Sequence, residues 1–203
     1  MRESSKAMLR RFSDPKEADF WKTVFSGKGI DIGCGDDIIQ VDGVRGFDKS
    51  HGDANVLDHY FGYDHYDYIH ASQCLEHMHD PKEALQRWMQ VLKGGGYCVV
   101  TVPSWELYEG MIWPSRFNPD HKSTFSMWQN GSPAKHHVKV PEWLEENFPN
   151  DTICICRLVD TNYDYKVGTR VDQTYNPENR VEAFIEFVIQ KAGGSILSRI
   201  FKN

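Results

Sequence analysis

A glycine turn with an acidic neighbour is the first place in this sequence where the residue types could bind a ligand. Residues 30–35 read Ile-Asp-Ile-Gly-Cys-Gly and end a short β-type run. The glycines at 33 and 35 let the backbone turn sharply and approach a ligand with no Cβ in the way. A dinucleotide-binding fingerprint would need a third glycine at 38, where Ile38 stands. Because Asp31 lies beside the turn, we expect a cationic group on the ligand rather than a pyrophosphate.

Two further carboxylates follow at positions that suit the rest of such a ligand. Asp48 comes directly after a β-type run at 44–47, where a carboxylate can accept hydrogen bonds from both hydroxyls of a ribose. Asp53, in the segment Gly52-Asp53-Ala54, could accept from an adenine amino group. An amino-acid end, a ribose and an adenine are the three parts of S-adenosylmethionine. Each acid alone is more often a turn or cap residue, and it is their order that favours this cofactor.

Two histidines are candidates for taking a proton from an acceptor group. His77 follows the β-type run at 66–70, and an imidazole titrates close to neutral pH. His121 lies in a later aromatic-rich segment, where Asp120 could orient it. The alternative for His77 is to orient the helix that starts after it. The alternative for His121 is a surface position beside a capping aspartate.

The sequence predicts no metal site. His70, Cys74 and His77 would share a face only in a helix, and the β-type run reaching His70 interrupts such a helix. Cys154 and Cys156 share one face of a predicted strand but lack a second pair of ligands. A magnesium ion held by Asp and His side chains between 103 and 140 has no positive support in the sequence.

The elements that must position these residues alternate along the chain. Each copy of Asp-Pro-Lys-Glu, at 14–17 and 80–83, predicts a helix start, since Asp can cap, Pro suits the first turn and Glu can close a capping box. The glycines at 94–96 are expected to stop the second helix. Early strands alternating with helices, followed by two late strands, predict an α/β fold with a mostly parallel sheet and an antiparallel C-terminal edge. The predicted strands are 29–32, 44–47, 66–70, 97–102, 153–159 and 183–189.

Composition excludes several classes of protein. The chain has 203 residues, 40% hydrophobic and 26% charged, which suits one globular domain and excludes a collagen, a coiled coil or a disulfide-rich miniprotein. A net charge of −6 gives no overall attraction to phosphate backbones, so we expect no nucleic-acid partner. We expect neither a secretory signal nor an integral membrane segment, because the apolar run at 97–102 is too short to span a bilayer. Five cysteines without framework spacing indicate the reducing cytoplasm.

Residues 103–140 interrupt the alternation of strands and helices. The segment holds four prolines and six large aromatic residues, and a connection of this length is often a lid or a binding insertion. The alternative is an aromatic satellite core over the sheet, and the two interpretations are compatible. Trp105, Tyr108, Trp113 and Asp120 are the predicted substrate-binding residues, because aromatic side chains can stack on a sugar or another ring.

Five motifs in order resemble those of class I S-adenosylmethionine-dependent methyltransferases, and the similarity is closest to the small-molecule group called type 11. The resemblance covers residues 15–102 and implies a Rossmann-like fold with S-adenosylmethionine as cofactor. The motifs are Asp-Ile-Gly-Cys-Gly at 31–35, Phe-Asp at 47–48, Gly-Asp-Ala at 52–54, Tyr-Asp-Tyr-Ile-His-Ala-Ser-Gln-Cys-Leu-Glu-His at 66–77 and Val-Leu-Lys-Gly-Gly-Gly at 91–96.

The resemblance also implies roles for individual residues. Gly33, Cys34 and Gly35 would lie along the methionine part of the cofactor, with Asp31 near its amino group. Asp48 would bind the ribose hydroxyls. The last four expected cofactor contacts are Asp53 and Ala54 beside the adenine, and Ala71 and Ser72 facing the cofactor.

The spacing of the acids departs from the family's pattern. Asp31 and Asp48 are 17 positions apart, and Asp48 and Asp53 are five apart. The family normally places a full helix in each of these gaps, and neither has room for a helix and a return strand. We therefore expect shortened helices, and an adenine side that is open or covered by another element or subunit.

These observations predict a single methyltransferase domain that O-methylates a small molecule. A sugar or surface-glycan precursor is the expected acceptor, on resemblance alone. One alternative is a catalytically inactive module that binds S-adenosylmethionine or S-adenosylhomocysteine. Another is a protein or nucleic-acid methyltransferase, against which the net charge and the lack of an Asn/Asp-Pro-Pro-aromatic signature after His70 both count. The expected parts are an N-terminal arm (1–14), a cofactor-binding half (15–102), a substrate-covering insertion (103–140), a C-terminal sheet half (141–192) and a tail (193–203) that is an amphipathic docking helix or a frayed end.

Overall fold

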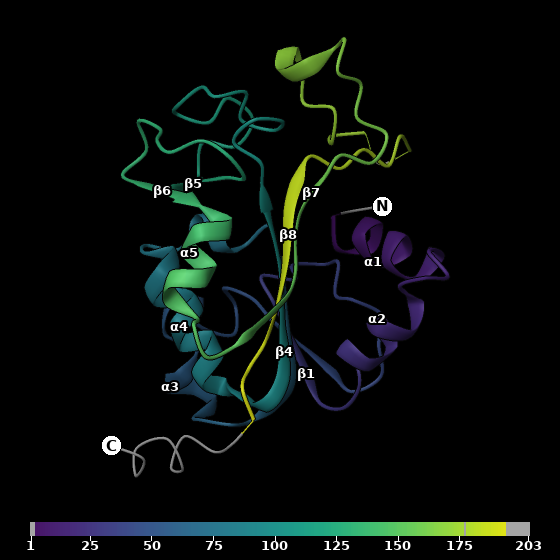
Figure 1. The fold of residues 1–203 in the computed structure, drawn as a ribbon, viewed down its shortest axis with the longest axis vertical. Coiled ribbons are helices and arrows are strands. Elements are labelled where there is room, and N and C mark those ends of the chain that lie inside the picture. The colour runs from purple at the N-terminus through teal and green to yellow at the C-terminus, as the bar shows by residue number, and fades with distance from the viewer. Residues whose placement is uncertain (1–2, 177, 194–203) are drawn as a thin grey trace.

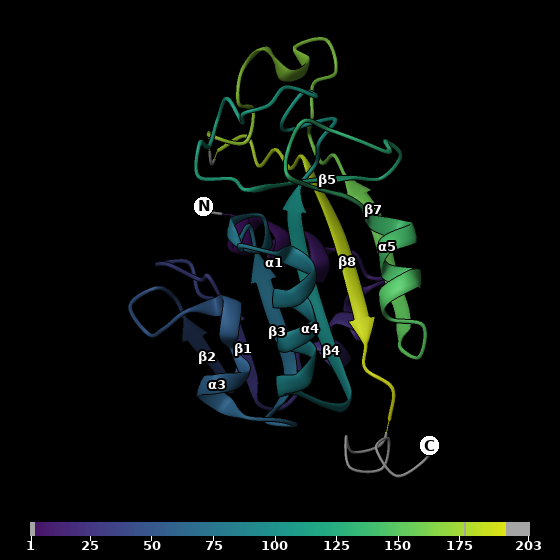
Figure 2. The same ribbon diagram turned by 90° about the vertical axis from the view of Figure 1, so that its left-hand side faces the viewer.

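A computed structural model describes residues 3–176 and 178–193, so the tail from 194 onward lies outside the described residues. A six-stranded sheet runs through the centre of the molecule (Figures 1 and 2). Its strands, in spatial order, are β2 (Val44–Phe47), β1 (Gly29–Ile32), β3 (Tyr66–Ser72), β4 (Leu92–Pro103), β8 (Phe184–Gln190) and β7 (Thr152–Val159).

The sheet is mostly parallel. β1 pairs in parallel with β2 and β3, and β3 pairs in parallel with β4. β8 is antiparallel to both of its neighbours, β4 and β7. The predicted α/β fold with an antiparallel C-terminal edge is therefore confirmed. Residues 98–103 of β4 are buried on both faces, which is why this part of the strand reads as a nearly continuous apolar run rather than an alternating one.

Helices cover both faces of the sheet. α3 (Asp58–Phe61), α4 (Pro81–Val91) and α5 (Val140–Asn147) lie on one face, and α1 (Glu3–Ser13) and α2 (Ala18–Val24) lie on the other (Figure 1). The larger hydrophobic core forms under α4, whose Leu85 and Trp88 are fully buried. A smaller core on the opposite face is built around Trp21 of α2.

The two Asp-Pro-Lys-Glu motifs behave differently. At the second, Asp80 accepts hydrogen bonds from the backbone N–H groups of Lys82 and Glu83, so α4 begins as predicted. At the first, α2 starts only at Ala18 and no side chain caps it. The predicted stop at 94–96 is wrong. α4 already ends at Val91, and the three glycines lie inside β4, in the irregular stretch between its Leu92–Tyr66 and Tyr97–Tyr68 pairings with β3.

The connections beside the glycine turn are short, as the spacing predicts. No helix occurs between β1 and β2 within the described chain. Between β2 and β3 lie only a single 3-10 turn, η1 (Ala54–Val56), and the four-residue α3. The strand ends on this side of the sheet are therefore left without the cover of long helices.

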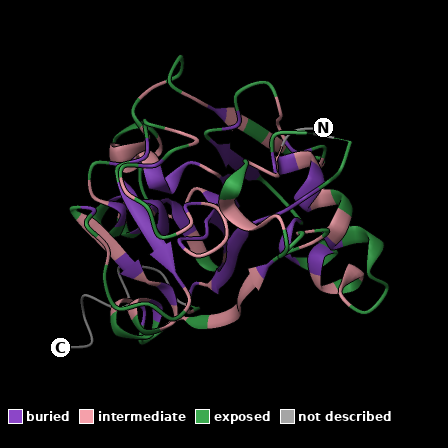
Figure 3. Ribbon diagram, turned by 90° about the horizontal axis from the view of Figure 1, so that it is seen from above, coloured by how far each residue is buried: buried purple, intermediate pink, exposed green. Residues whose placement is uncertain are grey.

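Loops form a layer beyond the C-terminal ends of β3 and β4 (Figure 2). The predicted insertion contributes the small parallel pair β5 (Ser123–Ser126) and β6 (His136–Lys139). A second long connection, at 160–183, carries the 3-10 turn η3 (Gly168–Arg170) and joins the same layer. Viewed from above, the sheet is buried and much of this layer is exposed (Figure 3). Across the described chain no helix has the length and apolar character needed to cross a membrane.

Helix α1, which the sequence analysis did not predict, is anchored by charges. Arg11 is fully buried, and its Nε donates to Glu186 of β8 at 2.8 Å. Arg10 and Arg157 also bind Glu186, at 2.8 and 2.7 Å. Three arginines around one buried carboxylate give α1 a fixed place against the sheet.

Candidate functional site

A pocket of about 710 Å³ opens at the C-terminal ends of β1, β2 and β3. Its volume lies within the range of roughly 300–1,000 Å³ that small-molecule sites span. The end of a parallel sheet is also where α/β proteins bind ligands. We call it the first pocket. Its lining residues are Gly33, Phe47, Asp48, Lys49, Gly52, Asp53, Ala54, Asn55, Gln73, Cys74, His77, Met78, Asp120 and Lys122.

The glycine turn forms one wall of the first pocket. Gly33 has a positive φ of 70°, and an added Cβ would lie 2.6 Å from Sγ of Cys74. Gly35 donates its backbone N–H to Oδ2 of Asp48 at 2.8 Å. The turn that follows β1 and the carboxylate that follows β2 are thus joined, as their places at adjacent strand ends require.

Asp53 and Ala54 lie at the other side of the first pocket. Asp53 caps η1 by accepting from the backbone N–H of Asn55 at 2.9 Å and from its side chain at 2.7 Å. These hydrogen bonds lower the pKa of the Asp53 carboxyl. Asp53 therefore both caps η1 and lines the first pocket.

Asp31 lies elsewhere. Its side chain is fully buried, with Oδ1 2.6 Å from Nδ1 of His70 and Oδ2 accepting from the backbone N–H of Ile39 at 2.9 Å. Nε2 of His70 lies 3.1 Å from Nη1 of Arg11. This arrangement differs from the expected contact with the amino group of the cofactor, because the carboxylate is fully buried and Asp31 is not among the residues that line the first pocket.

Four other expected cofactor contacts, Cys34, Gly35, Ala71 and Ser72, are also absent from the lining of the first pocket. The side chain of Cys34 lies against Gly46, and a Cβ added to Gly46 would be 2.9 Å from Sγ of Cys34. Ala71 is fully buried, and Ser72 accepts a hydrogen bond from Thr101 at 2.9 Å. β3 runs two residues further than predicted, to Ser72, so the turn into the pocket comes later.

Gln73 and Cys74 occupy the positions expected for Ala71 and Ser72. Gln73 has a positive φ of 53°, and its backbone N–H donates to the carbonyl of Thr101 at 3.0 Å. The side-chain nitrogen of Gln73 is buried and has no hydrogen-bond partner. Sequence reasoning missed Gln73, because nothing in the residue types marks where a strand of this kind ends.

A second pocket of about 570 Å³ adjoins the first. The two pockets share Gln73 and His77, which form the boundary between them. The remaining residues of the second pocket come from α1, from the turn after β3, from both long connections in the upper layer and from the start of β8. They are Glu3, Glu76, Tyr108, Asn118, His121, Asp172, Thr174, Tyr175 and Phe184.

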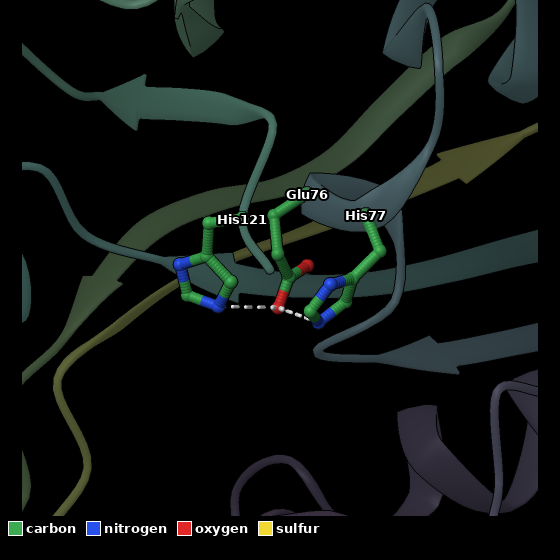
Figure 4. A group of neighbouring side chains, drawn as sticks. All are labelled: Glu76, His77 and His121. Carbon is green, nitrogen blue, oxygen red and sulfur yellow. Dashed lines mark ion pairs between the residues drawn. The ribbon is translucent and has the colours of Figure 1, made fainter. Parts of the chain in front are cut away.

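The predicted catalytic residues His77 and His121 meet at the wall of the second pocket, with Glu76 between them (Figure 4). Oε1 of Glu76 lies 3.8 Å from Nε2 of His121 and 4.0 Å from Nε2 of His77. The other ring nitrogens are engaged outside the group. Nδ1 of His121 lies 2.7 Å from Oε1 of Glu109, and Nδ1 of His77 lies 3.2 Å from the carbonyl oxygen of Asp120. We call Glu76, His77 and His121 the Glu76 cluster.

Burial governs the electrostatics of the Glu76 cluster. It raises the pKa of Glu76 to about 7. It also lowers the pKa of His77, and the nearby His121 adds to that effect. Burial lowers the pKa of His121 too, but the hydrogen bond to Glu109 and the charge of Glu76 outweigh it, so that pKa is raised. Both oxygens of Glu76 are buried without a hydrogen-bond partner.

The predicted substrate-binding residues separate into two groups. Tyr108 lines the second pocket, with its ring centroid 5.8 Å from that of His121, and Asp120 lines the first pocket. Trp105 is buried and packs against His137 instead. Trp113 is partly buried and belongs to neither lining set. The insertion thus combines both expected roles, a wall of the site and an aromatic core of its own.

Known proteins share this architecture. A family model described as a methyltransferase domain matches residues 6–142, which is more than half of the chain. A search of curated proteins finds no match. An S-adenosylmethionine-dependent methyltransferase from Archaeoglobus fulgidus is 16% identical, with a TM-score of 0.53 over 94% of this chain and 95% of that one.

Two further solved structures agree. The S-adenosylmethionine-dependent methyltransferase from Mesorhizobium loti is 15% identical, with a TM-score of 0.52 over 93% of this chain and 98% of that one. A chain from the complex of the Haloferax volcanii Trm112 methyltransferase activator with a methyltransferase is 14% identical, with a TM-score of 0.50 over 94% and 95%. At such identities the likeness concerns the fold, and the family match carries the assignment. The chain belongs to the methyltransferase domain family and is a class I S-adenosylmethionine-dependent methyltransferase.

Proposed function

We propose that this methyltransferase O-methylates an uncharged, hydroxyl-bearing small molecule such as a sugar, bound in the second pocket. The observation that carries the proposal is the contact between the two pockets at Gln73 and His77. A cofactor in the first pocket and an acceptor in the second would meet at this boundary. Direct displacement needs the two reactants held in line and close together, which adjoining pockets can provide.

The first pocket suits S-adenosylmethionine. Gly33 lines the pocket with a positive φ and a close approach to Cys74 that a side chain would prevent, and the Asp48 carboxylate at the end of β2 lines the pocket where ribose hydroxyls could bind. Asp53 and Ala54 would flank the adenine. Gln73, with an unpartnered side-chain nitrogen, is the added candidate for a contact with the methionine part. The cofactor supplies an electrophilic methyl group, so the protein has mainly to align the acceptor and exclude water.

The chemistry of the second pocket supports an uncharged acceptor. Glu3, Glu76 and Asp172 line it, and among the described residues no lysine or arginine does. This acidic lining disfavours phosphate groups, and with them nucleic acid. Tyr108, Tyr175 and Phe184 offer ring faces on which a sugar can stack. A surface-glycan precursor fits this description.

His77 and His121 are the proposed catalytic residues. Their Nε2 atoms converge at the wall of the acceptor pocket, while their Nδ1 atoms are held by Asp120 and Glu109. A hydroxyl placed there meets ring nitrogens that can accept its hydrogen. All five cysteines have free thiols, which supports the proposed cytoplasmic location.

Calorimetric titration with S-adenosylmethionine and S-adenosylhomocysteine is the first test. We expect micromolar binding of both, followed by methyl transfer in a screen of neutral sugars and other polyols. Binding of S-adenosylhomocysteine without methyl transfer to any acceptor would favour the inactive binding module. The short connections after β1 and β2 are the observation that supports this alternative. Salt-sensitive retention of RNA or DNA in a filter assay would instead favour a nucleic-acid substrate.

A further inference from the structure

We propose that the Glu76 cluster binds one divalent transition-metal cation at the wall of the second pocket, through Oε1 of Glu76 and Nε2 of His77 and His121. Resting on the proposed function, we further infer that this cation binds the hydroxyl oxygen of the acceptor, so that with the cation present the two Nε2 atoms hold the metal and do not themselves accept the hydroxyl proton. A metal could not be predicted from spacing, because His77 and His121 come from segments more than 40 positions apart.

The first argument is the convergence of three metal-ligand atoms. The candidate atoms of Glu76, His77 and His121 all lie within 4.8 Å of one another. Figure 4 shows the two imidazole rings on either side of the carboxylate, each with one nitrogen directed at the same oxygen. A cation between the three would need only small side-chain adjustments to reach distances of about 2.0–2.2 Å.

The second argument is the state of the outer ring nitrogens. His121 directs Nδ1 at the carboxylate of Glu109, and His77 directs Nδ1 at the carbonyl of Asp120. Both partners accept hydrogen bonds, so each Nδ1 carries a proton, and a cation can bind at Nε2 once the ring is in its neutral form. Each Nε2 is then left with a free lone pair. Metal-binding histidines are oriented by this kind of hydrogen bond.

The third argument is the unpartnered carboxylate itself. Glu76 is fully buried, and neither of its oxygens has a hydrogen-bond partner. Lys122, whose backbone N–H donates to the carbonyl oxygen of Glu76, uses its Nζ to donate to the carbonyl oxygen of His77 at 2.9 Å. A buried carboxylate that faces two nitrogen lone pairs is unfavourable unless a positive charge joins them. A cation supplies that charge, and the alternative is a proton shared within the cluster.

The ligand set indicates the class of cation. Two imidazoles and one carboxylate with open positions suit Fe²⁺, Mn²⁺, Co²⁺ or Zn²⁺ better than Mg²⁺ or Ca²⁺, which prefer oxygen ligands. The open positions would face the second pocket, where one or two neighbouring hydroxyls could bind. During transfer the bound hydroxyl loses its proton to solvent, its oxygen forms the bond to the methyl carbon, and the sulfur keeps the electron pair of the broken carbon–sulfur bond.

Metal binding can be tested without an acceptor. Chelator-stripped protein would be titrated with Mn²⁺, followed by electron paramagnetic resonance, and the bound ion probed for nitrogen coupling. We expect one ion per chain with two coupled imidazole nitrogens. Glu76→Gln and His121→Ala should each weaken binding at least tenfold, or about 1.4 kcal/mol. His79→Ala is the matched control, since His79 is exposed two positions from His77 and should bind as wild type.

The outcomes separate this inference from the proposed function. Each variant would also be titrated with S-adenosylmethionine, whose affinity we expect to stay within about twofold of wild type. If neither Mn²⁺ nor Zn²⁺ binds near 1 mM, the metal site is overturned. The same holds if Glu76→Gln and His121→Ala bind these ions as well as the wild type does. A proton shared within the Glu76 cluster would then be the remaining explanation. Metal binding by a folded protein that takes up no S-adenosylmethionine would instead overturn the proposed function.

Discussion

Two buried acid–histidine groups occur in this protein, and they differ in the partners of the acid. Asp31 and His70 pair across β1 and β3, and Arg11 of α1 completes the group at 3.1 Å from the imidazole. Glu76 lies between His77 and His121, where neither of its oxygens has a partner. The first group is closed inside the core, whereas the second lines a pocket.

The difference shows what separates a structural acid from a site. Both carboxylates are fully buried and both contact imidazole, so residue types alone do not distinguish them. Asp31 has each oxygen hydrogen-bonded and a guanidinium nearby, which offsets much of the cost of burial. Neither oxygen of Glu76 has a hydrogen-bond partner, its two imidazole neighbours are 3.8 and 4.0 Å away, and its side chain lines the second pocket. An uncompensated buried charge is the stronger indication of a missing ligand.

Removal of Arg11 should have the largest effect on stability. Arg11→Ala leaves Glu186 and the Asp31–His70 pair without their buried cation, and we expect a loss of about 3–5 kcal/mol in the free energy of unfolding. Urea denaturation followed by circular dichroism measures it. Arg10→Ala is the control, because Arg10 keeps part of its side chain in solvent and should cost less. Equal losses of unfolding free energy in the two variants would mean that the complete burial of Arg11 does not increase its contribution to stability.

Low pH should reduce the stability that the ion pairs of Glu186 contribute to the protein. Burial raises the pKa of Glu186, but Arg11, Arg10 and Arg157 outweigh it and hold that pKa well below its usual range. Stability from this carboxylate is full above about pH 4.3, its ordinary pKa, and is lost as pH falls toward the folded value. We expect a loss of roughly 2–3 kcal/mol by pH 2 from this group. Unfolding free energies of Glu186→Gln should depend less on pH across that range.

His121→Ala tests the Glu76 cluster at the second pocket through its effect on kcat. We expect kcat to fall about 100-fold, because the acceptor loses a group that orients or activates its hydroxyl. Affinity for S-adenosylmethionine, measured by calorimetry, should be unchanged, since His121 lines the second pocket and not the first. A parallel loss of kcat and cofactor affinity would assign His121 a structural role.

Asp48 and Asp31 compare an open and a closed acid at adjacent strands. Asp48→Ala should weaken S-adenosylmethionine binding at least tenfold, about 1.4 kcal/mol, because two charge-assisted hydrogen bonds to the ribose are lost. Asp31→Asn should lower the free energy of unfolding and affect the affinity of the folded protein much less. Calorimetry and urea denaturation of both variants measure this. Unchanged affinity in Asp48→Ala would remove the ribose assignment.

Glu76→Gln should produce the smallest change in stability. In metal-free protein, replacing an unpartnered buried carboxylate by a neutral amide of similar shape should leave the free energy of unfolding equal or raise it by about 1 kcal/mol. The Asp31→Asn variant, which disturbs a satisfied acid, should move in the opposite direction. A marked loss of stability in Glu76→Gln would show that Glu76 is as well compensated as Asp31.

Local pattern was enough for much of the fold. The apolar runs predicted the strands, and the second Asp-Pro-Lys-Glu motif predicted the start of α4 at Pro81. The short spacing between Asp31, Asp48 and Asp53 predicted the shortened connections. These features depend on neighbouring residues, whose propensities and chain length act whatever the rest of the molecule does.

The end of β3 and the helix α1 were beyond such reasoning. β3 continues to Ser72 because β4 offers hydrogen-bonding partners that far, and this moves Gln73 into the first pocket. α1 is held by Arg11 against Glu186, a residue 175 positions away. Pairing between distant segments overrides local preference in both cases.

Fold class, cofactor and the strand ends that bear the first pocket could be predicted from motifs whose members lie close along the chain. Which acids have partners in the folded protein could not be predicted in this way. Asp31 is hydrogen-bonded on both oxygens and Arg11 of α1 contacts its partner His70, whereas Glu76 faces His121 from the insertion after β4 at 3.8 Å with no hydrogen bond to either oxygen. Burial and charge balance depend on what the folded chain brings together, and sequence spacing does not record them.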